Sequence, residues 1–160
     1  MLDLLQTIVA GILATAVMSS FLYLVHWRGF ANADMIRALG SLLTRSEANA
    51  LIPGLIIHFT SGVVFSFVYV VFWSLWGFEG LGTYVALGAL TGAAHGLVVS
   101  FLLVSLIAGH HPLPRFQEAG VGVAFAHLLG HVVYGVAVGL IAGFYGLRYD
   151  FIPLLAQFPQ

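Results

Sequence analysis

Four long apolar segments follow one another along the chain, and none of them contains Asp, Glu, Lys or Arg. A helix needs about 20 apolar residues to cross the hydrocarbon core of a bilayer. The apolar runs are continuous and do not alternate with polar residues, which favours helices over barrel strands. We therefore predict an all-α fold, an integral membrane four-helix bundle forming a single transmembrane domain over residues 1–160, with spans at about 4–27, 53–76, 82–108 and 121–147.

A shorter amphipathic segment lies between the first two spans. Its apolar residues fall on one helical stripe, and Arg37, Ser41 and Arg45 lie opposite; the stripe consists of Met35, Ile36, Leu39, Leu42 and Leu43. This pattern predicts a short amphipathic helix that lies on the membrane interface or caps the bundle.

Composition narrows the class of protein further. Hydrophobic residues make up 61% of the chain and charged residues 7%, whereas a soluble domain carries about 25% charged residues. This excludes an ordinary soluble domain, a disordered chain and a nucleic-acid-binding protein, and it makes the lipid bilayer the expected partner. The absence of Cys excludes thiolate zinc sites, Cys-ligated iron–sulfur clusters and covalently attached c-type haem.

Four spans place both chain ends and the turn near Leu81 on one side of the membrane, and loops 28–52 and 109–120 on the other. The loop side carries four of the five arginines, and only Arg148 lies on the side of the chain ends. The excess of positive charge predicts that the loop side is cytoplasmic.

Rows of small or weakly polar residues recur at four-residue spacing in every span, for example Gly88, Gly92 and Gly96 in the third. Small residues let helix backbones approach closely in lipid. We interpret these rows as packing surfaces; the alternative is that they clear room for a flat ligand.

The second and fourth spans align with each other, as do shorter parts of the first and third. Residues 58–66 align with residues 127–135, and residues 11–13 align with residues 88–90. This similarity suggests a duplicated two-helix unit whose halves are related by an axis along the membrane normal. His58 and His127 would then occupy equivalent positions.

Four histidines lie within three of the spans: His58, His95, His127 and His131. A rise of 1.5 Å per residue places them about 9 to 20 Å below the loop side, so we expect them to converge on one layer. Ionisable groups within a bilayer usually face the bundle interior and serve function. Imidazole is the commonest metal ligand, and His127 and His131 share one helical face.

The expected ligand is a b-type haem or a transition-metal ion such as Cu, Zn or Fe. No carboxylate lies within the spans, which disfavours Mg²⁺ and Ca²⁺, whereas nitrogen ligands suit the later transition metals. A haem would need two histidines on different helices, either His58 with His127 or His95 with His131. The loop pair His110 and His111, together with Glu118 and Tyr134, are expected to form an entrance or to support the ligands; Glu118 could instead cap the fourth span.

The predicted role is electron transfer, metal handling or assistance to a metal enzyme. No nucleophile–base pair, phosphate loop or carboxylate pair supports hydrolytic chemistry, so an enzyme is not the favoured class. Two alternatives remain: an accessory subunit of a larger membrane complex or homo-oligomer, whose histidines only pack, and a proton-responsive membrane protein.

The region from His58 to Tyr145 resembles a family of small bacterial inner-membrane proteins with no assigned activity. The similarity lies in His58 and His95 within their spans, the segment Phe116–Glu118, and the segment Gly130–Val133. The resemblance implies a bacterial inner membrane. In that family Glu can replace the histidine at position 127, which keeps both metal binding and proton transfer open. It also implies a cytoplasmic C-terminus, opposite to the orientation that the arginines predict.

Overall fold

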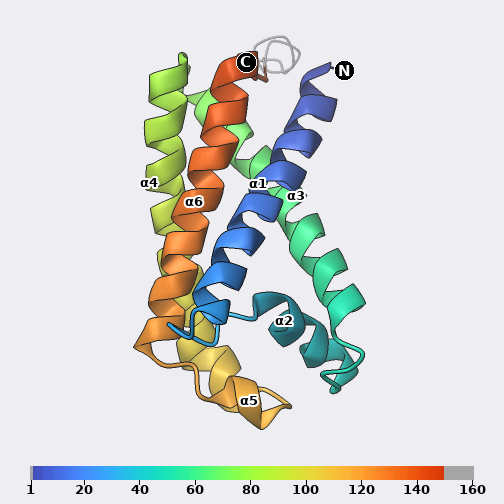
Figure 1. Ribbon diagram of the computed structural model, residues 1–160. Coiled ribbons are helices and arrows are strands. Elements are labelled where there is room, and N and C mark those ends of the chain that lie inside the picture. The colour runs from blue at the N-terminus through green and yellow to red at the C-terminus, as the bar shows by residue number, and fades with distance from the viewer. Residues whose placement is uncertain (1, 150–160) are drawn as a thin grey trace, which may run out of the picture.

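The computed structural model describes residues 2–149, and every regular element in that range is a helix (Figure 1). The elements are α1 (Leu2–Trp27), α2 (Met35–Thr44), α3 (Leu51–Leu75), α4 (Leu81–Leu102), α5 (Pro114–Gln117) and α6 (Val121–Tyr145). A π-helical segment, Leu103–Ile107, and a 3-10 turn, Ala108–His110, prolong α4. The predicted all-α class is confirmed within this range.

Four of these helices, α1, α3, α4 and α6, are long and apolar enough to cross a membrane. The second begins at Leu51, two residues before the predicted start, because Pro53 is tolerated in the first turn of a helix. The predicted third span ends at residue 108, and α4 with its π-helical segment reaches residue 107.

The helices are arranged with both described chain ends at the same end of the molecule, together with the turn between α3 and α4 (Figure 1). The other end holds α2 and α5. This is the disposition of loops that four consecutive spans predict.

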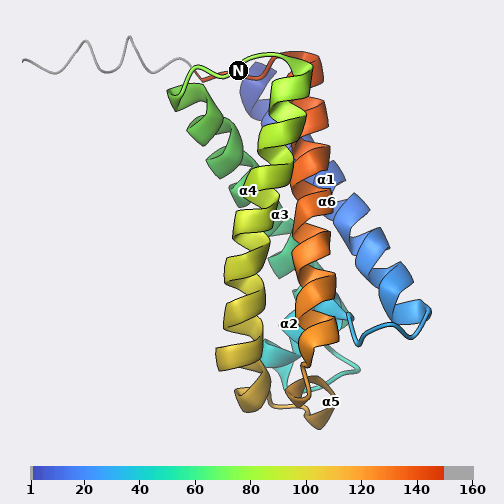
Figure 2. The ribbon, with the colours of Figure 1, turned by 90° about the vertical axis from the view of Figure 1, so that its left-hand side faces the viewer.

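The long helices do not pack equally on one another. α6 contacts both α4 and α1, and α1 also contacts α3. α4 and α6 run side by side in both views (Figure 1, Figure 2). By contrast, α3 and α4 barely touch although they are consecutive, because α3 leans away from α4 toward the α2 end (Figure 1). The bundle is therefore tight on one side and open on another.

Close backbone contact between α4 and α6 depends on facing glycines. A Cβ built on Gly88 would lie 2.1 Å from the carbonyl oxygen of Gly135, and one built on Gly135 would lie 2.0 Å from the carbonyl oxygen of Gly88. In the first helix pair, a Cβ on Gly11 would lie 2.7 Å from the Oγ of Ser66, the residue that the repeat aligns with Gly135. The contacts support the packing interpretation and fit the proposed duplication.

The predicted amphipathic helix is present as α2, but burial does not follow its apolar stripe throughout. Ser41 was placed on the polar side and is fully buried, whereas Leu43, placed on the apolar stripe, is 70% exposed. The reason is a backbone crossing between α2 and α3: a Cβ on Gly40 would lie 1.8 Å from the carbonyl oxygen of Ala50. Small residues therefore face the bundle, and part of the apolar stripe faces outward.

Candidate functional site

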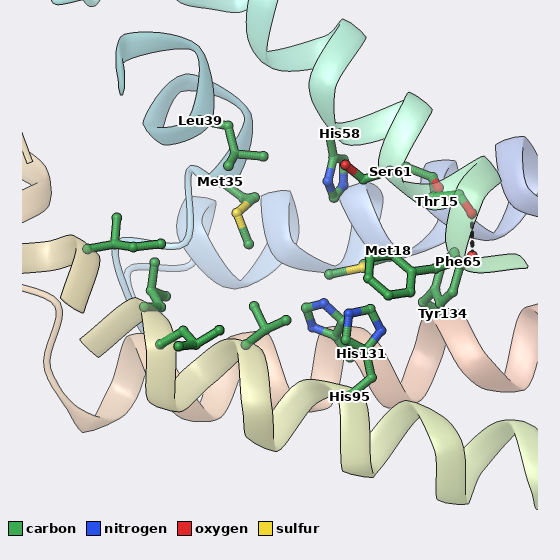
Figure 3. Close-up of a pocket in the computed structure, with 15 residues that line it drawn as sticks. Thr15, Met18, Met35, Leu39, His58, Ser61, Phe65, His95, His131 and Tyr134 are labelled. Carbon is green, nitrogen blue, oxygen red and sulfur yellow. Dashed lines mark hydrogen bonds between the residues drawn. The ribbon is translucent and has the colours of Figure 1, made fainter. Parts of the chain in front are cut away.

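An apolar cavity of about 260 Å³ lies on the open side of the bundle, between α3 and α4 (Figure 3). Helices α1, α2 and α6 complete its walls. Its lining is mainly apolar but includes three of the four predicted ligands: His58, His95 and His131. Three histidines from three helices thus line one cavity, of which His58 and His131 are buried and His95 is half-buried.

His58 reaches the cavity from α3, on the wall opposite the other two histidines (Figure 3). Its side chain is 8% exposed, and its Nε2 atom is buried without a hydrogen-bond partner. A buried nitrogen of this kind leaves hydrogen-bonding capacity unused. A ligand inside the cavity could satisfy it.

His131 and His95 form a pair of neighbouring rings on the opposite wall. Their ring centroids are 4.6 Å apart and the ring planes are inclined by 70°. The pair arises because α4 and α6 approach closely: a Cβ on Gly96, next to His95, would lie 3.0 Å from the Cβ of His131. The glycines therefore place the two rings together.

The ring of His131 has a defined tautomer. Its Nδ1–H donates to the carbonyl oxygen of His127 at 2.8 Å, since a carbonyl oxygen only accepts. In the neutral ring this leaves the lone pair on Nε2, the atom through which imidazole most readily binds a metal. His131 is 7% exposed and lines the cavity.

His95 is oriented by two aromatic neighbours on α3. Its Nδ1 lies 3.1 Å from the hydroxyl oxygen of Tyr69, and its ring lies 4.0 Å, centroid to centroid, from that of Phe65. Helices α3 and α4 have few contacts with each other, and these two are among them. Sequence reasoning missed Tyr69; its position one turn beyond Phe65 on the same helix face was the available signal.

His127 is not part of this cavity, contrary to the predicted layer of four. It is 2% exposed and lines a separate water-sized cavity beneath the α5 segment, where its Nε2 has no partner. One helical turn separates it from His131, and that turn carries it toward the α5 end of the helix. Among residues 2–149, no three His, Asp or Glu side chains lie close enough together to hold a metal ion.

The predicted entrance residues have other surroundings. His111 is 3% exposed: its Nδ1 accepts from the N–H of Leu113, so its Nε2–H donates to the carbonyl oxygen of Ala38 at 3.1 Å. This hydrogen bond joins the loop of residues 109–120 to α2. His110 lies at a surface depression with Leu42 and is exposed.

Glu118 and Tyr134 lie beside different cavities. Glu118 is exposed and borders the small cavity of His127, and α6 has no side-chain cap at its first residue. Tyr134 is buried and lines the main cavity, where its hydroxyl donates to the carbonyl oxygen of Gly62 at 2.5 Å. It therefore joins α6 to α3 and is not an entrance.

A second small cavity lies beside the main one, toward the α2 end. It shares His58 and Met35 with the main cavity, and its other lining residues include the polar side chains of His26 and Asp34. These two residues were not singled out in the sequence. Arg37 lines the same small cavity and pairs with Asp34 at 3.6 Å.

No family model, no curated protein and no solved structure matches this chain. The function is therefore inferred from the geometry of the cavity.

Proposed function

We propose that this protein is a membrane protein that binds a transition-metal ion through His95 and His131, with His58 as a third ligand, and serves metal handling or electron transfer. The observation that carries the proposal is the pair of neighbouring imidazoles facing a buried cavity, with a third imidazole on the opposite wall. We further propose, on the resemblance noted above, that this membrane is a bacterial inner membrane.

The distance between the rings of His95 and His131 suits two ligands of one metal ion. With metal–nitrogen bonds of about 2.0 Å, two imidazoles at a right angle around one metal have ring centroids roughly 4.5 Å apart. The centroids of His95 and His131 are 4.6 Å apart. Their separation therefore needs little change on binding.

Hydrogen bonds on the far nitrogens support the same role. A metal-bound histidine usually donates its other N–H to a carbonyl or another oxygen, which fixes the ring and increases its basicity. His131 donates to the carbonyl of His127, and the Tyr69 hydroxyl oxygen lies 3.1 Å from the Nδ1 of His95, where it would accept when that nitrogen carries the proton. Each ring can then present Nε2 to the ion.

His58 would join the ion by a movement of α3. That helix has few contacts with α4, and the movement would be made against its close backbone contacts with α1 and α2. The unpartnered Nε2 of His58 would gain a bond in the closed arrangement. Closure is thus coupled to binding.

A b-type haem is the second candidate, because His58 and His131 stand on opposite walls as two axial ligands do. The size of the cavity favours a metal ion. A cavity of about 150 Å³ accepts benzene, and this one measures about 260 Å³. A porphyrin is several times larger than benzene and would have to extend through the gap between α3 and α4.

Metal analysis and an absorption spectrum of the protein purified in detergent test the proposal. We expect about one metal ion per chain and no Soret band; a Soret band would identify haem instead. His95→Gln and His131→Gln should each lower the affinity for added Zn²⁺ at least tenfold. His110→Gln, which changes a histidine outside the cavity, should leave it unchanged.

Folding of each variant is checked by gel filtration and thermal unfolding without metal. Wild-type protein that binds no ion and shows no haem spectrum would overturn the proposal. A stoichiometric partner that copurifies with metal-free protein would favour the accessory subunit, and a histidine ring titrating near neutral pH in metal-free protein would favour the proton-responsive alternative.

A further inference from the structure

Two methionines face the same cavity as the three histidines. Met18 lies on α1 and Met35 begins α2, and they are two of the three methionines in the chain. Figure 3 shows the side chain of Met18 between His58 and the pair of His95 and His131, and that of Met35 to one side, near Leu39. Thioether sulfur is a soft ligand, and soft sulfur ligands favour Cu(I) among the metals of proteins.

The charge of the site points to the same ion. Every side chain that lines the cavity is uncharged or an imidazole, and no Asp, Glu, Lys or Arg is among them. The cost of burying an ion rises with the square of its charge, so an uncompensated divalent cation is far more costly here than a monovalent one. Cu(I) carries a single positive charge and accepts neutral nitrogen and sulfur ligands.

We propose, building on the metal-binding function above, that the ion is Cu(I) and that Met18 joins His95 and His131 as a ligand. Met35 passes the ion inward from the α2 end. Met35 and His58 line both the main cavity and the smaller one beside it, which also holds Asp34, His26 and Arg37. The copper remains Cu(I) throughout, and no electron is transferred.

Competition with the Cu(I) chelator bicinchoninate, under anaerobic reducing conditions, tests this assignment on the full chain in detergent. The double variant Met18→Leu/Met35→Leu removes both sulfurs while nearly conserving volume. We expect it to bind Cu(I) at least tenfold more weakly than wild type and Zn²⁺ within twofold of wild type. Leu39→Ile, a change of similar size in the cavity wall, should leave both affinities within twofold.

X-ray absorption gives a direct readout that does not depend on affinity. In selenomethionine-labelled protein, bound copper should show selenium among its nearest neighbours, and Met18→Leu should remove that signal. Wild-type affinity for Cu(I) in the double variant, or copper without selenium neighbours, would overturn the assignment.

The same titrations separate the two proposals. If wild-type protein binds Zn²⁺ through His95 and His131 but binds Cu(I) no more tightly, the metal site stands and the assignment to Cu(I) fails. If it binds neither ion, both proposals fail.

Discussion

The side chain of His131 is oriented by the backbone of His127: the Nδ1–H of the first donates to the carbonyl oxygen of the second at 2.8 Å. Two histidines on one helical face were expected to share a ligand. In the structure the two side chains have different surroundings. The ring of His131 lines the main cavity, and that of His127 lines a separate small cavity. The backbone of position 127 supports the site, and its side chain does not line it.

This difference predicts unequal effects of two matched substitutions. His127→Gln keeps the carbonyl that orients His131, so metal affinity should stay within about threefold of wild type. His131→Gln removes a proposed ligand and should lower affinity at least tenfold. Equilibrium titration in detergent measures both. A larger loss for His127→Gln would restore the original prediction that this side chain is a ligand.

Removing the hydroxyl of Tyr69 should weaken the site without removing a ligand. Partners that hydrogen-bond to a metal-bound histidine typically contribute 10- to 100-fold to affinity, and the Tyr69 hydroxyl lies 3.1 Å from the Nδ1 of His95. We expect Tyr69→Phe to bind metal about tenfold more weakly. Tyr23→Phe, at an exposed position, is the control. Equal affinities for the two variants would show that this hydrogen bond has no role in binding.

The glycine contact between α4 and α6 should be sensitive to one added methyl group. Gly135→Ala would place a Cβ 2.0 Å from the carbonyl oxygen of Gly88 and force the helices apart. Overpacking of this kind destabilises proteins by about 1–3 kcal/mol, which unfolding in mixed detergent would detect. Gly82→Ala adds a methyl group into open space and should change stability little. If Gly135→Ala left the free energy of unfolding unchanged, α4 and α6 would have to pack less closely than the structure shows.

Arg115 joins the second loop to the first, so its loss should loosen the α5 segment. Its guanidinium pairs with Asp34 at 3.2 Å and with Glu47, and its backbone carbonyl accepts from the side chain of Asn32. These groups are partly exposed, so each pair contributes at most about 1 kcal/mol. Hydrogen exchange should therefore speed up over residues 111–118 in Arg115→Gln. Arg28→Gln, which removes a contact with the Trp27 ring, should not have this effect.

The sidedness of the chain can be tested cleanly because it has no cysteine. Ala48→Cys and Glu79→Cys place single thiols at opposite ends of the bundle, in exposed positions. A membrane-impermeant maleimide applied to intact cells should label only Glu79→Cys if the arginine-rich end is cytoplasmic. The reverse labelling would support the orientation implied by the family resemblance.

Much of the fold could be predicted from the sequence because lipid imposes strong constraints. Span length and the absence of charge set α1, α3, α4 and α6 within a few residues of their observed bounds. The rows of small residues predicted close packing but could not say which helices pair. That choice depends on how two surfaces fit together, as at Gly88 and Gly135.

The candidate site was harder to predict because it also depends on how the helix surfaces fit together. Helical periodicity places His127 and His131 on one face, yet the turn between them is enough to put them in different cavities. The apolar stripe of α2 does not by itself reveal which of its residues are buried, since Leu43 is exposed and Ser41 is not. For a helix beside lipid, the small residues Gly40 and Ser41 face the protein instead.

Because α3 has few contacts with α4, the thickness and lateral pressure of the bilayer should affect the tilt of α3. A helix that leans outward occupies more area in the plane of the membrane, so lateral pressure from the acyl chains favours its upright position. Thicker or more ordered membranes should therefore narrow the space beside His58, and thinner ones should widen it. If the cavity binds a metal ion as proposed, lipid composition would tune the affinity without any change in sequence.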